Sequence, residues 1–347
     1  MSTISKPKVL IVGCGAVGLT QGYHLSFGAS ITFLVRPGRK PAFQPPKKLY
    51  DYKTNALNVF NDYRVIESPK EVAGEDFLFV FDTLDGHTAR SEGGVATLKA
   101  VANLIRDHQQ TFVVYDAVGL DMEDHYATTM GIPKDRLLLA ASMLAHQPTK
   151  SISLPPNADA GLVSHADMFY ASWGDTNGLN VFNTQPKHVK TLGEIYSKHD
   201  KIRIGVLPAF MSSAGLMVGI LQVVSWSADG SQSFEHFRQN TELWNLMLAA
   251  QSEILNLPRF GWTGWLSSWV MGSWATAKIV TAPVEAVKPL AYHEFNDFHH
   301  GAKVNKQDIM VIEQLIADGE RSKHKMVACR EMCRRAEAKA AEKAGSS

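Results

Sequence analysis

The stretch LIVGCGAVGLT occupies residues 10–20 and carries three glycines, Gly13, Gly15 and Gly18, directly after an apolar run. That run, residues 8–13, is short, continuous and rich in β-branched side chains, which predicts a buried parallel strand. A helical pattern follows the glycines, and a second apolar run follows the helix. A glycine turn between a strand and a helix is the context in which this spacing binds a dinucleotide.

Each glycine of such a turn has its own physical role. Gly13 permits the tight bend, Gly15 lets the backbone approach a diphosphate, and Gly18 lets helix and strand pack closely. The helix starts at Ala16 and Val17, where unpaired N–H groups and a partial positive charge attract phosphate. The sequence therefore predicts a dinucleotide site here. The alternative is a structural bend in a domain that has lost its nucleotide.

The second predicted strand ends in LVRPGRK, with Arg36, Arg39 and Lys40 and no acidic residue. Sites for NAD usually place an Asp or Glu at this point, where it accepts a hydrogen bond from the ribose 2′-hydroxyl. Cations at the same point pair with a 2′-phosphate, and a guanidinium can do so bidentately. We therefore expect NADP(H). A solvated loop charge remains the other interpretation, more readily for Lys40 than for Arg36.

The composition narrows the class of protein. The chain has 347 residues, 45% of them hydrophobic, which predicts about two globular domains. A net charge of +1 offers nothing that attracts nucleic acid. Three cysteines are too few for a disulfide framework, and no apolar segment reaches the ~18 residues of a membrane span. We expect a cytoplasmic protein that binds neither nucleic acid nor membrane.

Strand and helix patterns alternate through the first half of the chain, and residues 162–174 and 201–206 are the last predicted strands of that half. The predicted fold class is α/β, a Rossmann-type parallel sheet domain followed by an all-helical domain. We place the NADP(H)-binding domain at 1–205, the helical substrate and dimerisation domain at 206–340, and a disordered tail at 341–347. Within the helical domain we expect one helix over 233–257 and Gly319 as a helix cap.

Several of these features together resemble the ketopantoate reductase family. They are the segments VGCGAVGLTQGYHL and LVR, the helical second half, and the late segment YHEFNDFHHG at residues 292–301. The resemblance implies reduction of a 2-keto acid by NADPH in a cleft between the two domains. It also implies a catalytic role for Glu294, which matches the family's glutamate.

The sequence departs from that family where the family keeps a proton donor. The first helix of its second domain carries a catalytic Lys followed by Asn residues, and the matching positions here fall near Phe210, Ala214 and Val218. Reduction of a ketone needs a proton donor within hydrogen-bond reach of the developing oxygen anion. We therefore expect a divergent member that lacks the family's catalytic Lys and Asn residues and takes a substrate bulkier than ketopantoate.

The segment AYHEFNDFHHGAKV contains the replacement that we expect. Histidine exchanges protons near neutral pH, so His299 or His300 is the candidate for the absent Lys. The competing interpretation is a polar helix at the domain interface whose histidines are already hydrogen-bonded. No metal-ligand spacing supports a zinc site in this segment.

Four tryptophans, Trp262, Trp265, Trp269 and Trp274, recur within a short segment of the helical half. This clustering favours a tightly packed core over an apolar pocket wall. Taken together, the patterns predict an NADPH-dependent oxidoreductase that reduces a carbonyl or imine of a small molecule and forms a homodimer. Two alternatives stay open: an NADP(H)-binding sensor without turnover, and a non-redox isomerase or cyclase on the same fold.

Overall fold

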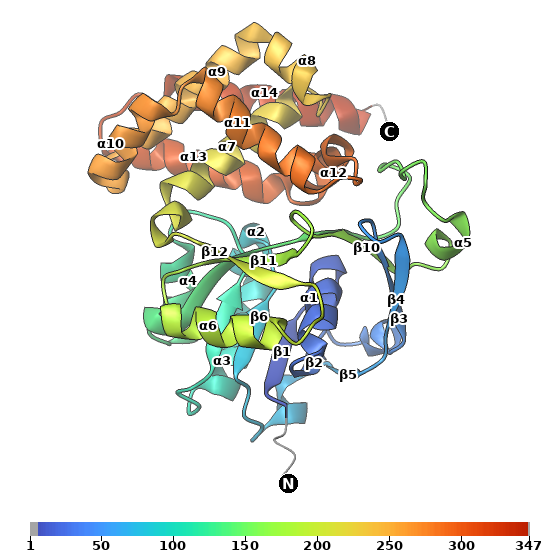
Figure 1. The fold of residues 1–347 in the computed structure, drawn as a ribbon. Helices are drawn as coiled ribbons and strands as arrows, with labels where there is room; N and C mark the ends of the chain where they lie inside the picture. Colours follow the sequence, from blue (N-terminus) through green and yellow to red (C-terminus); the bar gives the residue numbers. More distant parts are fainter. Residues whose placement is uncertain (1–5, 346–347) are drawn as a thin grey trace.

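The computed structural model describes residues 6–345 and arranges them as a sheet-containing half with a helical half stacked on it (Figure 1). Within the described residues the main sheet has eight strands in the order β12-β11-β8-β7-β6-β1-β2-β5. Pairing is parallel from β5 through β8, while β11 runs antiparallel to β8. These strands are β1 (Lys8–Val12), β2 (Ser30–Leu34), β5 (Tyr63–Ile66), β6 (Phe79–Asp82), β7 (Phe112–Tyr115), β8 (Leu137–Ser142), β11 (Asn177–Phe182) and β12 (Arg203–Leu207).

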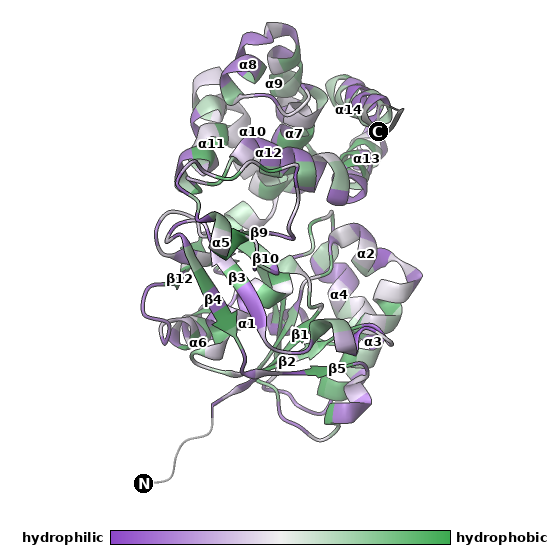
Figure 2. Cartoon of the chain, turned by 90° about the vertical axis from the view of Figure 1, so that its right-hand side faces the viewer, coloured by the Kyte–Doolittle hydropathy of each residue, from purple (hydrophilic) through white to green (hydrophobic). Residues whose placement is uncertain are grey.

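Both faces of this sheet are covered, which confirms the predicted α/β class. Val9 and Ile11 of β1 are buried in one core, and Leu10 and Val12 in the other. A strand buried on both sides is expected to be mostly apolar, and strands of the main sheet are largely green in Figure 2. The covering helices are α1 (Ala16–Ser26) and α6 (Pro186–Tyr196) on the first face, and α2 (Gly86–Arg90), α3 (Glu92–Ile105) and α4 (Met122–Met130) on the second.

A second, four-stranded sheet lies beside the first in the order β4-β3-β10-β9. The sequence patterns did not predict β3 and β4, which are only half-buried and mix polar with apolar residues. The expected main-sheet strand at 162–174 is wrong in its partner, because β10 pairs with β3 and β9 instead. The elements of this layer are β3 (Lys47–Asp51), β4 (Ala56–Phe60), β9 (Leu144–His146), β10 (Met168–Ala171) and α5 (Ala160–Val163).

The helical half packs around α7, which is apolar on nearly all sides because α9, α13 and α14 surround it. The short turn η4 follows β12 and connects the two halves. Because β12 ends at Leu207, the boundary predicted at 205/206 falls inside this strand. The helices and turns are η4 (Ala209–Ser212), α7 (Ala214–Ala228), α8 (Phe234–Gln239), α9 (Thr241–Leu255), η5 (Pro258–Phe260), α10 (Gly261–Val270), α11 (Ser273–Ala286), α12 (Tyr292–Phe298), η6 (His299–Lys303), α13 (Asn305–Arg321) and α14 (Val327–Gly345).

Three local expectations for this half differ from the structure. The helix expected over 233–257 is two helices, because Asn240 ends α8 and its side chain accepts from Leu243 N to begin α9. Gly319 lies inside α13 rather than after it, and a Cβ there would meet Met326 Cγ at 2.4 Å. Helix α14 continues through Gly345 into the expected tail, of which residues 346–347 lie outside the description.

The tryptophans of α10 and α11 are not core residues. Trp262, Trp265, Trp269 and Trp274 are 53–74% exposed, so the prediction that they pack in the core is wrong. The core of this half is filled instead by α7, α9, α13 and α14. Among residues 6–345, no helix combines the length and the apolar composition that crossing a bilayer requires.

Candidate active site

The glycine turn between β1 and α1 places each glycine against a different surrounding. Gly13 has a φ of +97°, and a Cβ there would lie 2.6 Å from Thr83 Oγ1. A Cβ on Gly18 would lie 2.3 Å from the backbone oxygen of Gly13, whereas at Gly15 nothing lies within 4 Å. Two of the glycines therefore keep the turn tight, and Gly15 faces open space. This is the cradle that the close approach of a diphosphate needs.

The first turn of α1 leaves backbone donors available. No side chain caps the helix at Gly15, and the first helical hydrogen bond runs from Leu19 N to Gly15 O at 2.9 Å. The N–H groups of Ala16, Val17 and Gly18 have no partner inside the helix, as at every helix start. They are suited to an anionic group, which the helix dipole also favours.

The predicted cations follow β2, next to this turn. Gly13 N donates to Leu34 O at 2.9 Å, so the end of β2 is held against the glycine turn. Within the described chain neither Arg36 nor Arg39 forms an ion pair, and both are exposed. Arg39 stacks over the Phe43 ring at 5.7 Å. Arg36 is therefore a free guanidinium at the point where an adenosine 2′-phosphate is expected.

Lys40 differs from the two arginines. Its Nζ lies 3.1 Å from Glu71 Oε2, and its backbone N donates to Glu67 at 2.8 Å. The lysine charge is thus already neutralised locally.

The late polar segment changes helix type at its histidines. Helix α12 passes into η6, a turn of π-helix over His299–Lys303, and such turns occur frequently at functional sites. His300 Nδ1 lies 2.8 Å from Asp308 Oδ2, and Asp308 is 1% exposed. A carboxylate only accepts hydrogen bonds, so Nδ1 carries the proton and Nε2 is left for another partner. Such an Asp–His pair orients an imidazole.

His299 has a different environment. Burial, followed by the charges of His300 and Lys303, holds the pKa of its imidazole well below the usual value. Its Nδ1 is buried and has no hydrogen-bond partner among the described residues. The ring stacks on Phe295 at a centroid distance of 5.2 Å. A histidine kept neutral in this way is a poor proton donor, so the structure separates the two predicted histidines.

Glu294 is engaged with the sheet-containing half. Its carboxylate accepts from Ser153 N and from Ser153 Oγ, the latter at 3.0 Å. The contact ties α12 to the segment between β9 and α5. Glu294 therefore holds the two halves together in this structure and is not paired with His300.

Gln307, beside Asp308 on α13, connects the helical half to the segments that follow β6 and β7. Its Oε1 accepts from Gly86 N at 2.5 Å and from Val118 N at 3.3 Å. The His300–Asp308 pair thus lies one residue from the contact between the halves.

Two buried carboxyls end the central strands below this contact. Burial raises the pKa of Asp82 to about 7, although the Tyr126 hydroxyl donates to it. Burial likewise raises the pKa of Asp116 to about 6, while Ser142 N donates to it at 3.3 Å. Near neutral pH these carboxyls are partly protonated.

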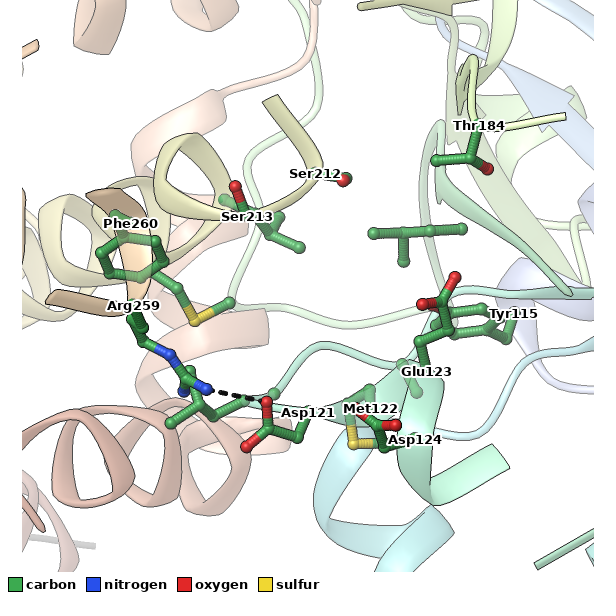
Figure 3. A pocket seen from close by; sticks show the side chains of 16 residues that line it. Tyr115, Asp121, Met122, Glu123, Asp124, Thr184, Ser212, Ser213, Arg259 and Phe260 are labelled. Carbon is green, nitrogen blue, oxygen red and sulfur yellow. Dashed lines mark hydrogen bonds and ion pairs between the residues drawn. The ribbon is translucent and has the colours of Figure 1, made fainter. Parts of the chain in front are cut away.

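A cavity of about 290 Å³ opens between the two halves, on the side of β7 and β8 (Figure 3). Ser212 and Ser213 line it from the start of the helical half, where their hydroxyls donate to Ala209 O and Phe210 O, and Thr184 lines it from the turn after β11. The cavity is also lined by Tyr115, Ala117, Gly119, Leu120, Asp121, Met122, Glu123, Asp124, Leu139, Leu216, Met217, Arg259 and Phe260.

The charged groups of this wall largely neutralise one another. Arg259 lies 2.9 Å from Asp121 and 3.6 Å from Asp318, and Asp124 lies 2.6 Å from Lys134. No lysine lines the cavity, and the expected catalytic residues Glu294, His299 and His300 do not line it either. Polar and apolar atoms contribute about equally to the cavity surface.

Sequence reasoning missed Asp308, Gln307 and the cavity hydroxyls. Gln307 and Asp308 lie in the polar segment NKQD at residues 305–308, directly before the apolar residues of α13, and the sequence does not distinguish this segment from a solvated helix start. Among the described residues, no three His, Cys, Asp or Glu side chains gather as metal ligands would.

Comparisons with known proteins rest on structure. No family model matches the sequence, and no curated protein matches it. The 2-dehydropantoate 2-reductase of Geobacter metallireducens GS-15 superposes with a TM-score of 0.63 at 15% identity, over 95% of this chain and 99% of that one. The dimeric ketopantoate reductase of Staphylococcus aureus gives 0.61 at 11% identity, over 96% and 99%.

A D-mandelate dehydrogenase is also similar in structure. It was solved with NADH and anilino(oxo)acetate, and it superposes with a TM-score of 0.66 at 10% identity, over 96% of this chain and 98% of that one. Each of these similarities extends over nearly the whole of both chains. The chain therefore has the two-part fold seen in ketopantoate reductases and in D-mandelate dehydrogenase.

Proposed function

We propose that this protein is an NADPH-dependent oxidoreductase that reduces a carbonyl or imine carbon of a small, largely apolar molecule. The observation that carries the proposal is the open glycine cradle at Gly15 beside the unpaired guanidinium of Arg36. The names of the ketopantoate reductase and D-mandelate dehydrogenase neighbours indicate that those proteins act on small oxo or hydroxy compounds. That agrees with the proposed class of reaction.

The cofactor is held by residues that this chain places side by side. The N–H groups after Gly15 bind the diphosphate, and Arg36, assisted by Arg39, pairs with the 2′-phosphate. Bound NADPH supplies a hydride. The chain itself has to bind the substrate, orient it and provide a proton.

The substrate fits the cavity between the halves. The apolar part of its wall, which includes Leu139, Leu216 and Phe260, accepts the apolar body of a substrate bulkier than ketopantoate. Hydroxyls of Ser213 and Thr184 offer hydrogen bonds to a polar end. This supports the expectation of a bulkier substrate.

The proton comes from His300, held by Asp308. The cavity and this pair flank the same loop after β7: Ala117 and Gly119 line the cavity, and Val118 N contacts Gln307 beside Asp308. The proposal places the reacting carbon at that loop, between the cavity and the His300–Asp308 pair. His300 Nε2 then donates to the developing oxygen or nitrogen anion, a task that the family assigns to a lysine absent from α7.

The experiment that tests the cofactor is a binding titration with Arg36→Gln. Loss of charge-assisted hydrogen bonds should raise the dissociation constant for NADPH about tenfold to hundredfold, with NADH changed little. Calorimetry gives both constants. Lys40→Gln is the matched control, because Lys40 is paired with Glu71 and should leave NADPH binding unchanged.

Turnover is tested separately. Purified protein with NADPH and a panel of apolar 2-oxo acids, ketones and imines should show substrate-dependent loss of NADPH absorbance. Tight NADPH binding without turnover on the panel argues for a binding protein, and no binding of either dinucleotide contradicts the whole proposal. We also propose a homodimer, in line with the dimeric Staphylococcus aureus neighbour.

A further inference from the structure

Helix α10 presents its apolar side to solvent. Trp262, Trp265, Leu266, Trp269 and Val270 recur at helical spacing on one side and are each 47–74% exposed. The opposite side packs inward at Gly264, where a Cβ would lie 2.4 Å from Leu255 O. These five residues, with Trp274 at the start of α11, are called the tryptophan face. The helix lies at the outer end of the helical half (Figure 1).

The hydroxyl groups of α10 are already hydrogen-bonded to backbone oxygens. Thr263 Oγ1 donates to Phe260 O at 2.9 Å, Ser267 Oγ to Thr263 O at 2.8 Å and Ser268 Oγ to Trp265 O at 2.7 Å. No charged residue occurs in the sequence between Arg259 and Lys278. Burying this surface in a contact therefore leaves no charged side chain without water and breaks no hydroxyl hydrogen bond. The removal of water from its apolar area is favourable.

The size of the face matches one side of a stable interface. At 53–74% exposure and 150–250 Å² per aromatic side chain, the four tryptophans alone expose roughly 400–700 Å². Leu266 and Val270 extend that area. An apolar patch on a monomer rarely exceeds a few hundred Å², and each partner of a standard interface contributes about 800 Å².

We propose that the tryptophan face packs against the same face of a second copy of this chain, with α10 crossing its counterpart about a two-fold axis. A two-fold contact brings a surface against itself, so it favours a face without charges that would repel their own copies. Tryptophan enrichment and depletion of Lys, Glu and Asp mark the centre of such interfaces. A lipid surface is disfavoured, because the face itself has no Lys or Arg to attract anionic headgroups.

The contact also reaches the cavity. Helix α10 follows η5 directly, and Arg259 and Phe260 of η5 line the cavity beside Ser212 and Ser213. A second copy on α10 therefore holds the segment that forms one wall of the cavity. The surface assignment itself does not depend on the proposed reaction.

The experiment measures the mass of the full-length protein in solution by light scattering and sedimentation velocity. The wild type should be a dimer at micromolar concentration, and Trp265→Glu/Trp269→Glu should be a monomer with unchanged circular dichroism. Trp269→Ala, a milder change, should raise the dimer dissociation constant about thirtyfold or more. Val59→Glu on β4 and Val327→Glu on α14, both exposed apolar positions, should stay dimeric.

Three results overturn the proposal: a monomeric wild type, a dimer that survives Trp265→Glu/Trp269→Glu, or a monomer that binds phosphatidylcholine vesicles through the tryptophans. The last result assigns the face to a bilayer instead. If the Trp265→Glu/Trp269→Glu variant is monomeric and still binds NADPH, the result concerns the dimer contact alone and not the cofactor site.

Discussion

His299 and His300 are chain neighbours with the same side chain, and their surroundings give them opposite properties. The Nδ1 of His300 contacts a buried carboxylate, whereas the Nδ1 of His299 is buried and has no hydrogen-bond partner among the described residues. The sequence names both as candidates. The partner at Asp308, eight residues away, is what distinguishes them.

The proposed proton donor can be tested with His300→Gln. The variant keeps a side chain of similar reach but cannot exchange a proton, so the turnover rate should fall about 10²–10⁴-fold while NADPH affinity stays the same. Steady-state rates on an identified substrate give the comparison. His293→Gln serves as control, since His293 lies 3.9 Å from Glu294 and away from Asp308. An equal loss in both variants contradicts a role for His300.

Asp82 makes stability depend on pH. Its pKa is about 7 in the folded chain and about 3.9 when unfolded. Between these values the folded chain retains a proton that the unfolded chain has released, so the free energy of unfolding decreases as pH rises from 4 to 7. Asp82→Asn removes this dependence. The stability of Asp82→Asn relative to wild type should increase over that interval, by roughly 4 kcal/mol at most.

Urea unfolding at pH 4.5 and pH 7.5 measures this change. Asp62→Asn, at an exposed position, is the control and should show the same difference from wild type at both pH values. A constant difference for Asp82→Asn as well contradicts a raised carboxyl pKa.

At the scale of the element, the glycines of the β1–α1 turn have two roles. Gly13 and Gly18 are needed for the close packing of the turn, whereas Gly15 leaves space for a ligand. Gly18→Ala should destabilise the fold by about 1–3 kcal/mol, because its Cβ meets the Gly13 oxygen at 2.3 Å. Gly15→Ala should leave stability within about 0.5 kcal/mol, since its φ of −80° suits alanine and no atom lies near.

Gly15→Ala, which is expected to keep its stability, should instead lose NADPH affinity. Gly15→Ala places a methyl group where the diphosphate approaches, so NADPH affinity should fall at least about tenfold despite an unchanged melting temperature. Thermal unfolding and NADPH titration of both proteins check the pair. Unchanged affinity in Gly15→Ala argues that the turn holds no nucleotide.

Across the whole molecule, one side chain links the two halves through a buried contact. Gln307→Leu keeps the side-chain volume but leaves Gly86 N and Val118 N without an acceptor, at a cost of about 1–3 kcal/mol for each buried donor. The urea midpoint should fall accordingly. Lys306→Leu, the exposed neighbour, should change it little. A stable Gln307→Leu variant contradicts the importance of this contact for closing the cleft.

The sequence by itself determined the central strands of the main sheet, the glycine turn and the position of the cations after β2. These are local patterns: a buried strand has to be apolar, a tight turn next to a helix needs glycine, and Arg36 follows its strand directly. Their geometry depends on residues close in the chain, and the structure agrees with the pattern at each point.

Only the tertiary structure decided which side of α10 faces outward, where the cavity lies and which histidine has a carboxylate partner. The exposed tryptophans have the period expected of a core helix, and nothing in the sequence shows that α7, α9, α13 and α14 already fill that core. Likewise the contacts of Gln307 with Gly86 and of Glu294 with Ser153 join residues more than a hundred positions apart. Periodicity encodes the face of a helix, but the partner of that face is set by how distant segments pack.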